Sequence, residues 1–246
     1  MAPLSTHSHY SLMQGTDSPA AICRAARRMG YERLALTDTD NLYGLWKFLQ
    51  ACWQEGLVPI VGAEISDPRT NDRAVCLVKN PTGYANLCRL ITRRHRNPEF
   101  ALSTHLPQMA EGLLTLTARA DLLATWHCAG VHTAAALPGR PPSPFHPLVQ
   151  TARRLKIPLA AVPDSFFLEP RGFAVHRLLR AIAGNTTLSR LAPGDTAPDT
   201  AWLASPEEYR RRFAIRPQAV ANTHRLADEL TFDGPDSGLV MPPWQD

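Results

Sequence analysis

The sequence alternates short apolar runs with segments of helical periodicity, and this alternation restricts the fold more than any other feature. Five apolar runs bounded by turn residues have the length and composition of buried strands: 34–38, 58–65, 74–78, 112–117 and 157–162. Strands that alternate with helices predict an α/β fold with a mainly parallel sheet, closed or nearly closed into a barrel. The pattern alone does not separate a closed barrel from an open sheet.

Helix start and stop signals support this alternation. Ser18 and Pro19 supply an N-cap and a first-turn proline, and Gly30 ends the helix that follows. A second helix is expected over 41–56, where another glycine ends it. Further helices are expected after 79–84 and over 148–156.

The C-terminal region differs from the rest of the chain. The segment APGDTAPD (192–199) indicates a boundary, so residues 1–191 are expected to form the barrel. Residues 192–246 are expected to form a linker, two short helices over 205–213 and 216–230, and an extended tail.

Composition places the chain among globular proteins of the cytoplasm. The 246 residues are 44% hydrophobic, enough for one large core, and the formal net charge of +4 is mild. The five cysteines form no C-x-x-C pair and are expected to be reduced thiols. We find no apolar run of membrane-spanning length and no signal-peptide layout, so no membrane association is expected.

Polar residues gather where the predicted strands end. Histidines and carboxylates that converge from successive strand ends are typical of a divalent-metal site, and the candidates here are His7, His9, Asp38, Asp40, Glu64 and Asp164. Each also has a plainer interpretation. The aspartates could cap the next helix, the histidines could lie on the surface, and the glutamate could be a solvated loop residue.

A cluster of basic residues lies at the end of the third predicted helix. It consists of Arg89, Arg93, Arg94, His95 and Arg96. One interpretation is a solvated helix end that the helix dipole favours. The other is a patch of phosphate contacts made by the four arginines.

Several sequence blocks resemble, in order, the PHP domain of the alpha subunit of bacterial C-family DNA polymerase III. They include HSHYSLMQGTDSP (7–19), GYERLALTDTDNLYGLWKF (30–48), PIVGAEI (59–65), LVKNPTGYANLCRLI (77–91) and RRLKIPLAAVPDSFFL (153–168). Error-prone homologues of the alpha subunit look at least as similar as the replicative form. The resemblance implies a PHP-type distorted (β/α)7 barrel with a C-terminal helical extension.

The resemblance also implies an ancestral metal site that hydrolyses phosphate esters, but the family pattern is only partly kept. The ligand positions that keep a suitable residue are His7, Asp38, Glu64 and Asp164. The positions that lose it are Ser5, Thr39, Arg73, Arg119 and Phe166.

A guanidinium is always charged and would occupy the place of a dication. We therefore expect Arg73, and Arg119 with it, to pair with the remaining carboxylates in place of metals. Without metal to activate water, the site is expected to be inactive, with no cofactor.

The resemblance implies a non-catalytic domain or subunit in DNA replication or translesion repair synthesis. Its expected partners are a polymerase body in cis or in trans, DNA through that polymerase, and a proofreading or replisome subunit. The alternative is a metal-dependent phosphoesterase or 3′–5′ exonuclease that binds Zn, Mn or Fe at a reduced site. That site would use His7, His9, Asp38, Glu64 and Asp164. A weaker alternative is a nucleic-acid-binding protein that uses the arginines of the 89–96 cluster.

Overall fold

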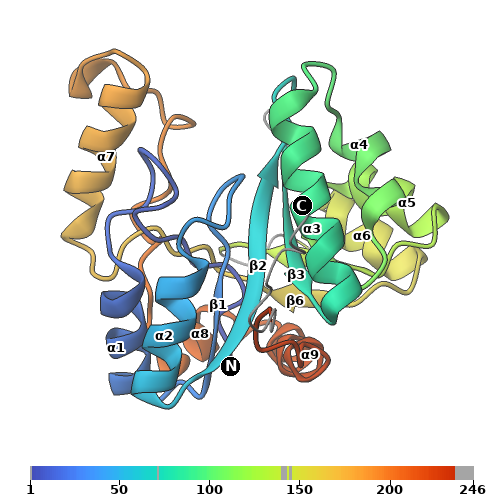
Figure 1. Ribbon diagram of the computed structural model, residues 1–246, viewed down its shortest axis with the longest axis horizontal. Coiled ribbons are helices and arrows are strands. Elements are labelled where there is room, and N and C mark those ends of the chain that lie inside the picture. Colours follow the sequence, from blue (N-terminus) through green and yellow to red (C-terminus); the bar gives the residue numbers. More distant parts are fainter. Residues whose placement is uncertain (1, 71, 140–142, 144–145, 236–246) are drawn as a thin grey trace, which may run out of the picture.

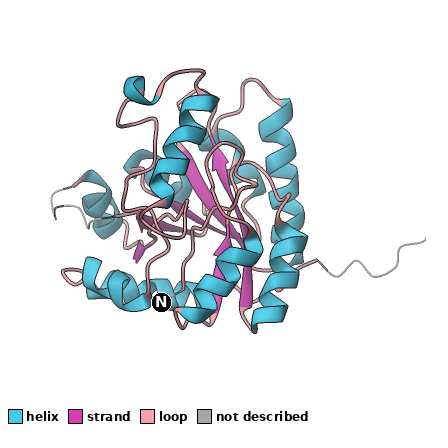
Figure 2. Ribbon diagram, turned by 90° about the vertical axis from the view of Figure 1, so that its left-hand side faces the viewer, coloured by secondary structure: helices cyan, strands magenta, loops and turns pink. Residues whose placement is uncertain are grey.

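The computed structural model describes residues 2–70, 72–139, 143 and 146–235. Within them, six strands form one mixed sheet in the order β1-β2-β3-β4-β5-β6. The strands are β1 (Arg33–Leu36), β2 (Val58–Ser66), β3 (Arg73–Val78), β4 (Leu113–Thr117), β5 (Thr133–Leu137) and β6 (Leu159–Ala161). Helices surround this sheet, which gives a mixed α/β half-barrel (Figure 2).

The sheet is less parallel than the sequence predicted. β1 pairs with β2 in parallel, and β5 pairs in parallel with both β4 and β6, but β3 is antiparallel to both β2 and β4. Only residues 67–72 connect β2 to β3, and the Asp67 amide bonds to the Asp72 carbonyl at 2.8 Å within this connection. A parallel crossover needs a dozen or more residues, so this short connection forces a hairpin.

An N-terminal segment, residues 3–7, joins the two edges of the sheet. The Thr37 amide beyond β1 donates to the Thr6 carbonyl at 2.8 Å. On the other side, the His7 amide donates to the carbonyl of Ser165, beyond β6, at 2.8 Å. The segment therefore closes the half-barrel by backbone hydrogen bonds, although it forms only an isolated bridge rather than a regular strand.

The helices cover the outside of the sheet (Figure 1). They are α1 (Pro19–Arg28), α2 (Leu45–Glu55), α3 (Pro81–Arg96), α4 (Leu102–His105), α5 (Ala120–Cys128), α6 (Pro147–Arg154), α7 (Gly172–Ala183), α8 (Pro206–Arg212) and α9 (Pro217–Asp228), with 3₁₀ turns η1 (Pro107–Met109) and η2 (Leu188–Arg190). None of the helices in the described ranges is both long and apolar enough to span a membrane. α7 stands away from the sheet at the upper left of Figure 1.

Side-chain caps explain where four of the described α-helices start, namely α1, α3, α6 and α8. The Ser18 side chain accepts a hydrogen bond from the Ala21 amide at 3.2 Å, which confirms the predicted start of α1. α2 starts at Leu45 and not at residue 41, so that prediction was wrong. Asp40 has a left-handed backbone with φ of 56°, and the Asn41 side chain accepts from the Tyr43 amide at 3.0 Å, which makes a turn before the helix.

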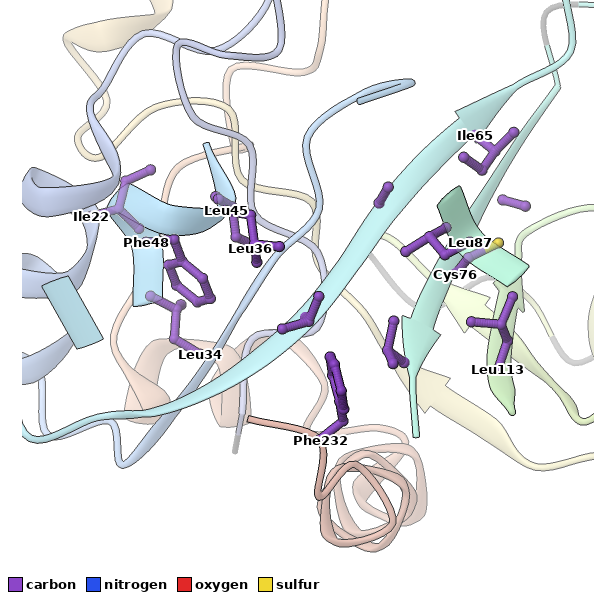
Figure 3. Packing of buried hydrophobic residues seen from close by; sticks show 14 of the residues in the cluster. Ile22, Leu34, Leu36, Leu45, Phe48, Ile65, Cys76, Leu87, Leu113 and Phe232 are labelled. Carbon is purple, nitrogen blue, oxygen red and sulfur yellow. The ribbon is translucent and has the colours of Figure 1, made fainter. Parts of the chain in front are cut away.

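The core has two faces because each strand is buried on both sides. Leu34 and Leu36 of β1 pack outward against the helices, whereas Ala35 between them packs inward with residues of the barrel interior. Figure 3 shows outward-facing residues on either side of β2, with Phe232 of the C-terminal segment packed below them. Such double burial produces continuous apolar runs in the sequence.

The helices after residue 191 share this core. Leu226 and Leu230 lie in the same buried cluster as Leu4 of the N-terminal segment. α9 is also fixed to β6 by hydrogen bonds, because the Thr223 hydroxyl donates to the Ala161 carbonyl at 2.9 Å. The tail predicted beyond residue 235 lies outside the described residues.

Candidate functional site

The four retained ligand positions come together at the carboxyl ends of β1, β2 and β6. His7 follows the N-terminal segment, Asp38 follows β1, Glu64 lies in β2 near its end, and Asp164 follows β6. The His7 Nε2 atom lies 4.0 Å from the Glu64 Oε2 atom. We call His7, Asp38, Glu64 and Asp164 the carboxylate cluster.

Asp38 accepts three hydrogen bonds from the loop after the N-terminal segment. Its Oδ1 atom accepts from the Ser8 amide and from the Ser11 hydroxyl, both at 2.7 Å. Its Oδ2 atom accepts from the Ser8 hydroxyl at 2.8 Å. These three donors occupy both carboxylate oxygens, so Asp38 holds the loop in place.

Glu64 is paired with Arg73, which was predicted to stand at a lost ligand position. The Arg73 Nη1 atom lies 2.9 Å from Glu64 Oε1, and the Thr39 hydroxyl donates to the same oxygen at 3.1 Å. The Glu64 side chain is only 4% exposed and that of Arg73 is 35% exposed. Burial raises the pKa of Glu64, while the Arg73 charge and the Thr39 hydrogen bond act to lower it.

Asp164 and His7 are the other two members of the carboxylate cluster. The Ser5 hydroxyl donates to Asp164 Oδ1 at 2.7 Å, and burial, together with the nearby Glu64 charge, raises the pKa of Asp164. His7 stacks on the Phe166 ring at 4.1 Å between centroids. Burial lowers the pKa of His7 to about 4, so its imidazole is neutral at pH 7.

Arg119 and His9 do not join the cluster. Arg119 is exposed and pairs with Asp121 at 2.8 Å and with Asp72 at 3.3 Å, so the expectation that it would pair with the carboxylate cluster was wrong. It lies at the N-cap of α5, where its side chain extends into solvent. His9 is also exposed and lies edge-on to the Tyr10 ring.

The residues present do not fit the metal site of the family. Within the described ranges, no three His, Cys, Asp or Glu side chains are placed to hold one ion. In addition, Asp38 accepts three hydrogen bonds and Glu64 faces a guanidinium, so oxygens that a metal would need already have partners. The five cysteines are free thiols and lie elsewhere.

Sequence reasoning missed four residues that support the site. Ser8 and Ser11 bind Asp38, while Gln14 accepts a hydrogen bond from Arg73 at 3.3 Å through its side chain.

The fourth residue, His176 of α7, is buried and contacts the Gln14 carbonyl through Nδ1 at 2.7 Å. The Ala197 amide donates to its Nε2 atom at 2.9 Å, so Nδ1 carries the proton. The lone histidine of α7, a helix in which Ala181 is the other buried residue, was the signal in the sequence.

Most arginines of the predicted phosphate patch on α3 form hydrogen bonds within the protein. The Arg94 Nε atom donates to the Ser66 carbonyl at 2.6 Å, and its Nη2 atom lies 3.4 Å from the Asp40 carboxylate. Arg93 bonds to the Gln108 side chain at 3.1 Å, and Arg89 bonds to that of Asn86 at 2.9 Å. Arg94 thus attaches α3 to the loop after β1, where Asp40 lies.

Replacing Arg94 by glutamine is expected to lower the free energy of unfolding by about 1–2 kcal/mol, because a partly buried charge-assisted contact is lost. The matched variant Arg93→Gln should change it by less than about 0.5 kcal/mol, since Arg93 is exposed. Urea unfolding of both variants measures the difference. Equal stabilities would show that Arg94 does not fasten α3 to this loop.

The sequence comparison identifies the family. Residues 3–169 match the family model described as PHP domain. This match covers more than half of the chain, so the chain belongs to the PHP domain family.

The curated relatives are polymerase subunits. The chain is 26% identical to DNA polymerase III subunit alpha of Treponema pallidum (strain Nichols), over 98% of this chain and 24% of that relative. It is 29% identical to the subunit alpha of Escherichia coli (strain K12), over 91% and 22%. It is 26% identical to the error-prone DNA polymerase of Anaeromyxobacter dehalogenans (strain 2CP-1), over 94% and 22%. The predicted kinship is confirmed, and the chain spans less than a quarter of each of these relatives.

Solved structures with a similar fold are more distant in sequence. A two-domain protein from Bacteroides vulgatus, which contains a predicted PHP-like metal-dependent phosphoesterase, matches with a TM-score of 0.49 and 12% identity. That match covers 67% of this chain and 51% of the other. An amidohydrolase from Chromobacterium violaceum matches with a TM-score of 0.46 and 17% identity, over 67% and 87%.

Proposed function

We propose that the chain is a non-catalytic PHP module of a bacterial DNA polymerase III alpha-type system, acting in replication or translesion repair synthesis. The observation that carries this proposal is the 2.9 Å ion pair between Arg73 and the buried Glu64. A phosphoesterase needs a divalent ion to activate water and to stabilise the leaving oxygen. A guanidinium fixed beside the carboxylate supplies structural charge balance instead.

The partners that we propose follow from the relatives. A polymerase body, in cis or in trans, would be the main partner, and DNA would be reached through it. A proofreading or replisome subunit is a second partner, and we place the protein in the cytoplasm. In this proposal, residues 3–7 act as the irregular seventh strand of a distorted (β/α)7 barrel over 1–191. Residues 192–246 would then form the extension toward the polymerase module.

One observation favours the alternative of a reduced-site phosphoesterase. The His7 Nε2 atom is buried and has no hydrogen-bond partner within the described residues, so it keeps a lone pair directed at no donor. Zn, Mn or Fe would have to be held by His7 with Glu64 and Asp164. It would have to displace the Arg73 guanidinium from Glu64. His9, the further ligand of this alternative, is exposed.

Metal analysis and turnover together test the proposal. Protein purified without chelator is expected to carry no stoichiometric Zn, Mn or Fe, and to hydrolyse neither a chromogenic phosphate monoester nor the 3′ end of an oligonucleotide when these ions are added. The variant Asp164→Asn controls for contaminating hydrolases. Stoichiometric metal together with turnover that Asp164→Asn abolishes would establish the phosphoesterase instead.

A further inference from the structure

A second concave surface lies at the opposite end of the sheet from the carboxylate cluster. It is a cavity of about 540 Å³ lined by the end of α6, the start of β6 and the start of α9. Leu159, the first residue of β6, lines it, whereas Asp164 of the cluster follows the other end of that strand. The two surfaces share no residue, so they can be tested separately.

The charged residues that line this cavity are all cations. They are Arg153, Lys156, Arg216 and Arg225, and none of the described residues that line the cavity is an aspartate or a glutamate. Cations that converge on one hollow with low-dielectric walls focus a positive potential inside it. We call this feature the basic hollow.

Three of these cations have no partner among the residues that the structure describes. In the described part of the chain, the side chains of Arg153, Lys156 and Arg225 make no hydrogen bond or ion pair, and all three are exposed. The arginines of the other sites behave differently, since Arg73, Arg94 and Arg119 each contact a carboxylate. The basic hollow therefore holds mutually repelling charges, and a bound anion would relieve that repulsion.

A hydrogen bond holds together two of the elements that line the basic hollow. The Asn222 side chain of α9 donates to the Leu159 carbonyl at 2.8 Å, which fixes the helix against the strand. Lys156 has a left-handed backbone with φ of 57°, in the turn that connects α6 to β6. Pro217, Gln218 and Ala219 at the start of α9 also line the hollow, so the positive end of that helix dipole adds to the potential.

We propose that the basic hollow binds a phosphate-bearing ligand, either the polyphosphate of a free nucleotide or the backbone of a nucleic acid. Arginine forks match phosphate oxygens in pairs, and Lys156 adds a point charge. A polyphosphate concentrates several negative charges in a space of this size. The carboxylates of an acidic peptide carry one charge each and are spread along an extended chain, so they suit the hollow less well.

Binding at low salt tests this proposal. The probes are pyrophosphate and a deoxynucleoside triphosphate, followed by thermal shift, and a fluorescent single-stranded oligonucleotide, followed by anisotropy. The test variant is Arg153→Gln/Lys156→Gln/Arg225→Gln. The matched control is Arg24→Gln/Arg27→Gln/Lys47→Gln, which removes the same charge from exposed residues of α1 and α2.

The wild type and the control are expected to bind, and the test variant is expected to bind about tenfold more weakly or worse, because three phosphate contacts are lost. If pyrophosphate and the nucleotide raise the melting temperature and the oligonucleotide does not bind, the ligand is a free nucleotide. Oligonucleotide binding that weakens steeply with salt would identify nucleic acid.

Three results would overturn the proposal. They are equal binding by the test variant and the control, tighter binding of a polyglutamate peptide than of any phosphate probe, and no binding of any probe by the wild type. If the triple variant does not fold, Arg225→Gln compared with Arg24→Gln gives the same contrast. Since no residue of the carboxylate cluster is changed, failure here leaves the proposed function untouched.

Discussion

Replacing Arg73 by alanine is expected to lower the free energy of unfolding by about 2 kcal/mol. The change leaves Glu64 buried without its cation, and removing one partner of a fully buried ion pair costs about 3–5 kcal/mol. The expected cost is smaller here because the Arg73 side chain is 35% exposed and water can partly replace it. Denaturant unfolding at pH 7 measures the difference.

Two further variants show whether this loss comes from the ion pair. Arg119→Ala should change the free energy by no more than about 0.5 kcal/mol, because Arg119 pairs at the exposed surface. Adding Glu64→Gln to Arg73→Ala should recover most of the lost stability, since the unpaired charge is gone. A negligible effect of Arg73→Ala, or no recovery in the double variant, would contradict the charge replacement that the proposed function assumes.

Acidification is expected to destabilise the wild type more than a His7→Gln variant, by about 3 kcal/mol between pH 7 and pH 4. The pKa of His7 falls from 6.5 to about 4 on folding because the ring is buried beside Phe166. Below pH 6.5 the unfolded chain therefore binds a proton that the folded chain does not. Each pKa unit corresponds to about 1.4 kcal/mol.

The sign of this effect distinguishes it from that of the neighbouring carboxylates. A lowered histidine pKa gives stability that is complete above pH 6.5 and is lost as the pH falls toward 4. Glu64 and Asp164 have raised pKa values, so their contribution is present at low pH and is lost as the pH rises through those values. The carboxylates and the buried His176 remain in both proteins, so comparison with His7→Gln isolates His7. Parallel curves of stability against pH would show that His7 is not buried in its neutral form.

Much of the fold could be predicted from the sequence, because buried strands and capped helices leave local signals in it. Five of the six strands were predicted from continuous apolar runs, and α1 began where Ser18 predicted. β5 was missed because its sequence, TAAAL, consists mainly of alanine, which favours helices and gives no strand signal. Its burial on both faces is decided by packing against β4 and β6, which are remote in sequence.

The candidate site could be predicted from the sequence only in part. The resemblance placed Arg73 at a ligand position, and the structure puts it against Glu64. The resemblance could not reveal that Ser8 and Ser11 donate hydrogen bonds to Asp38, since hydroxyl orientation depends on how the loop folds. Nor could it separate Arg94, which contacts Asp40, from the exposed Arg93 beside it, because both lie in one basic run.

The N-terminal segment that joins the two sheet edges has a consequence for synthesis on the ribosome. Its partner Ser165 lies almost 160 positions downstream of His7, so these hydrogen bonds cannot form until most of the chain exists. At translation rates of about 5–20 residues per second, that interval lasts roughly 8–30 seconds. During it, the side of residues 3–7 that later meets Ser165 stays unpaired, and the nascent polypeptide has its greatest opportunity to associate with another chain or with a chaperone.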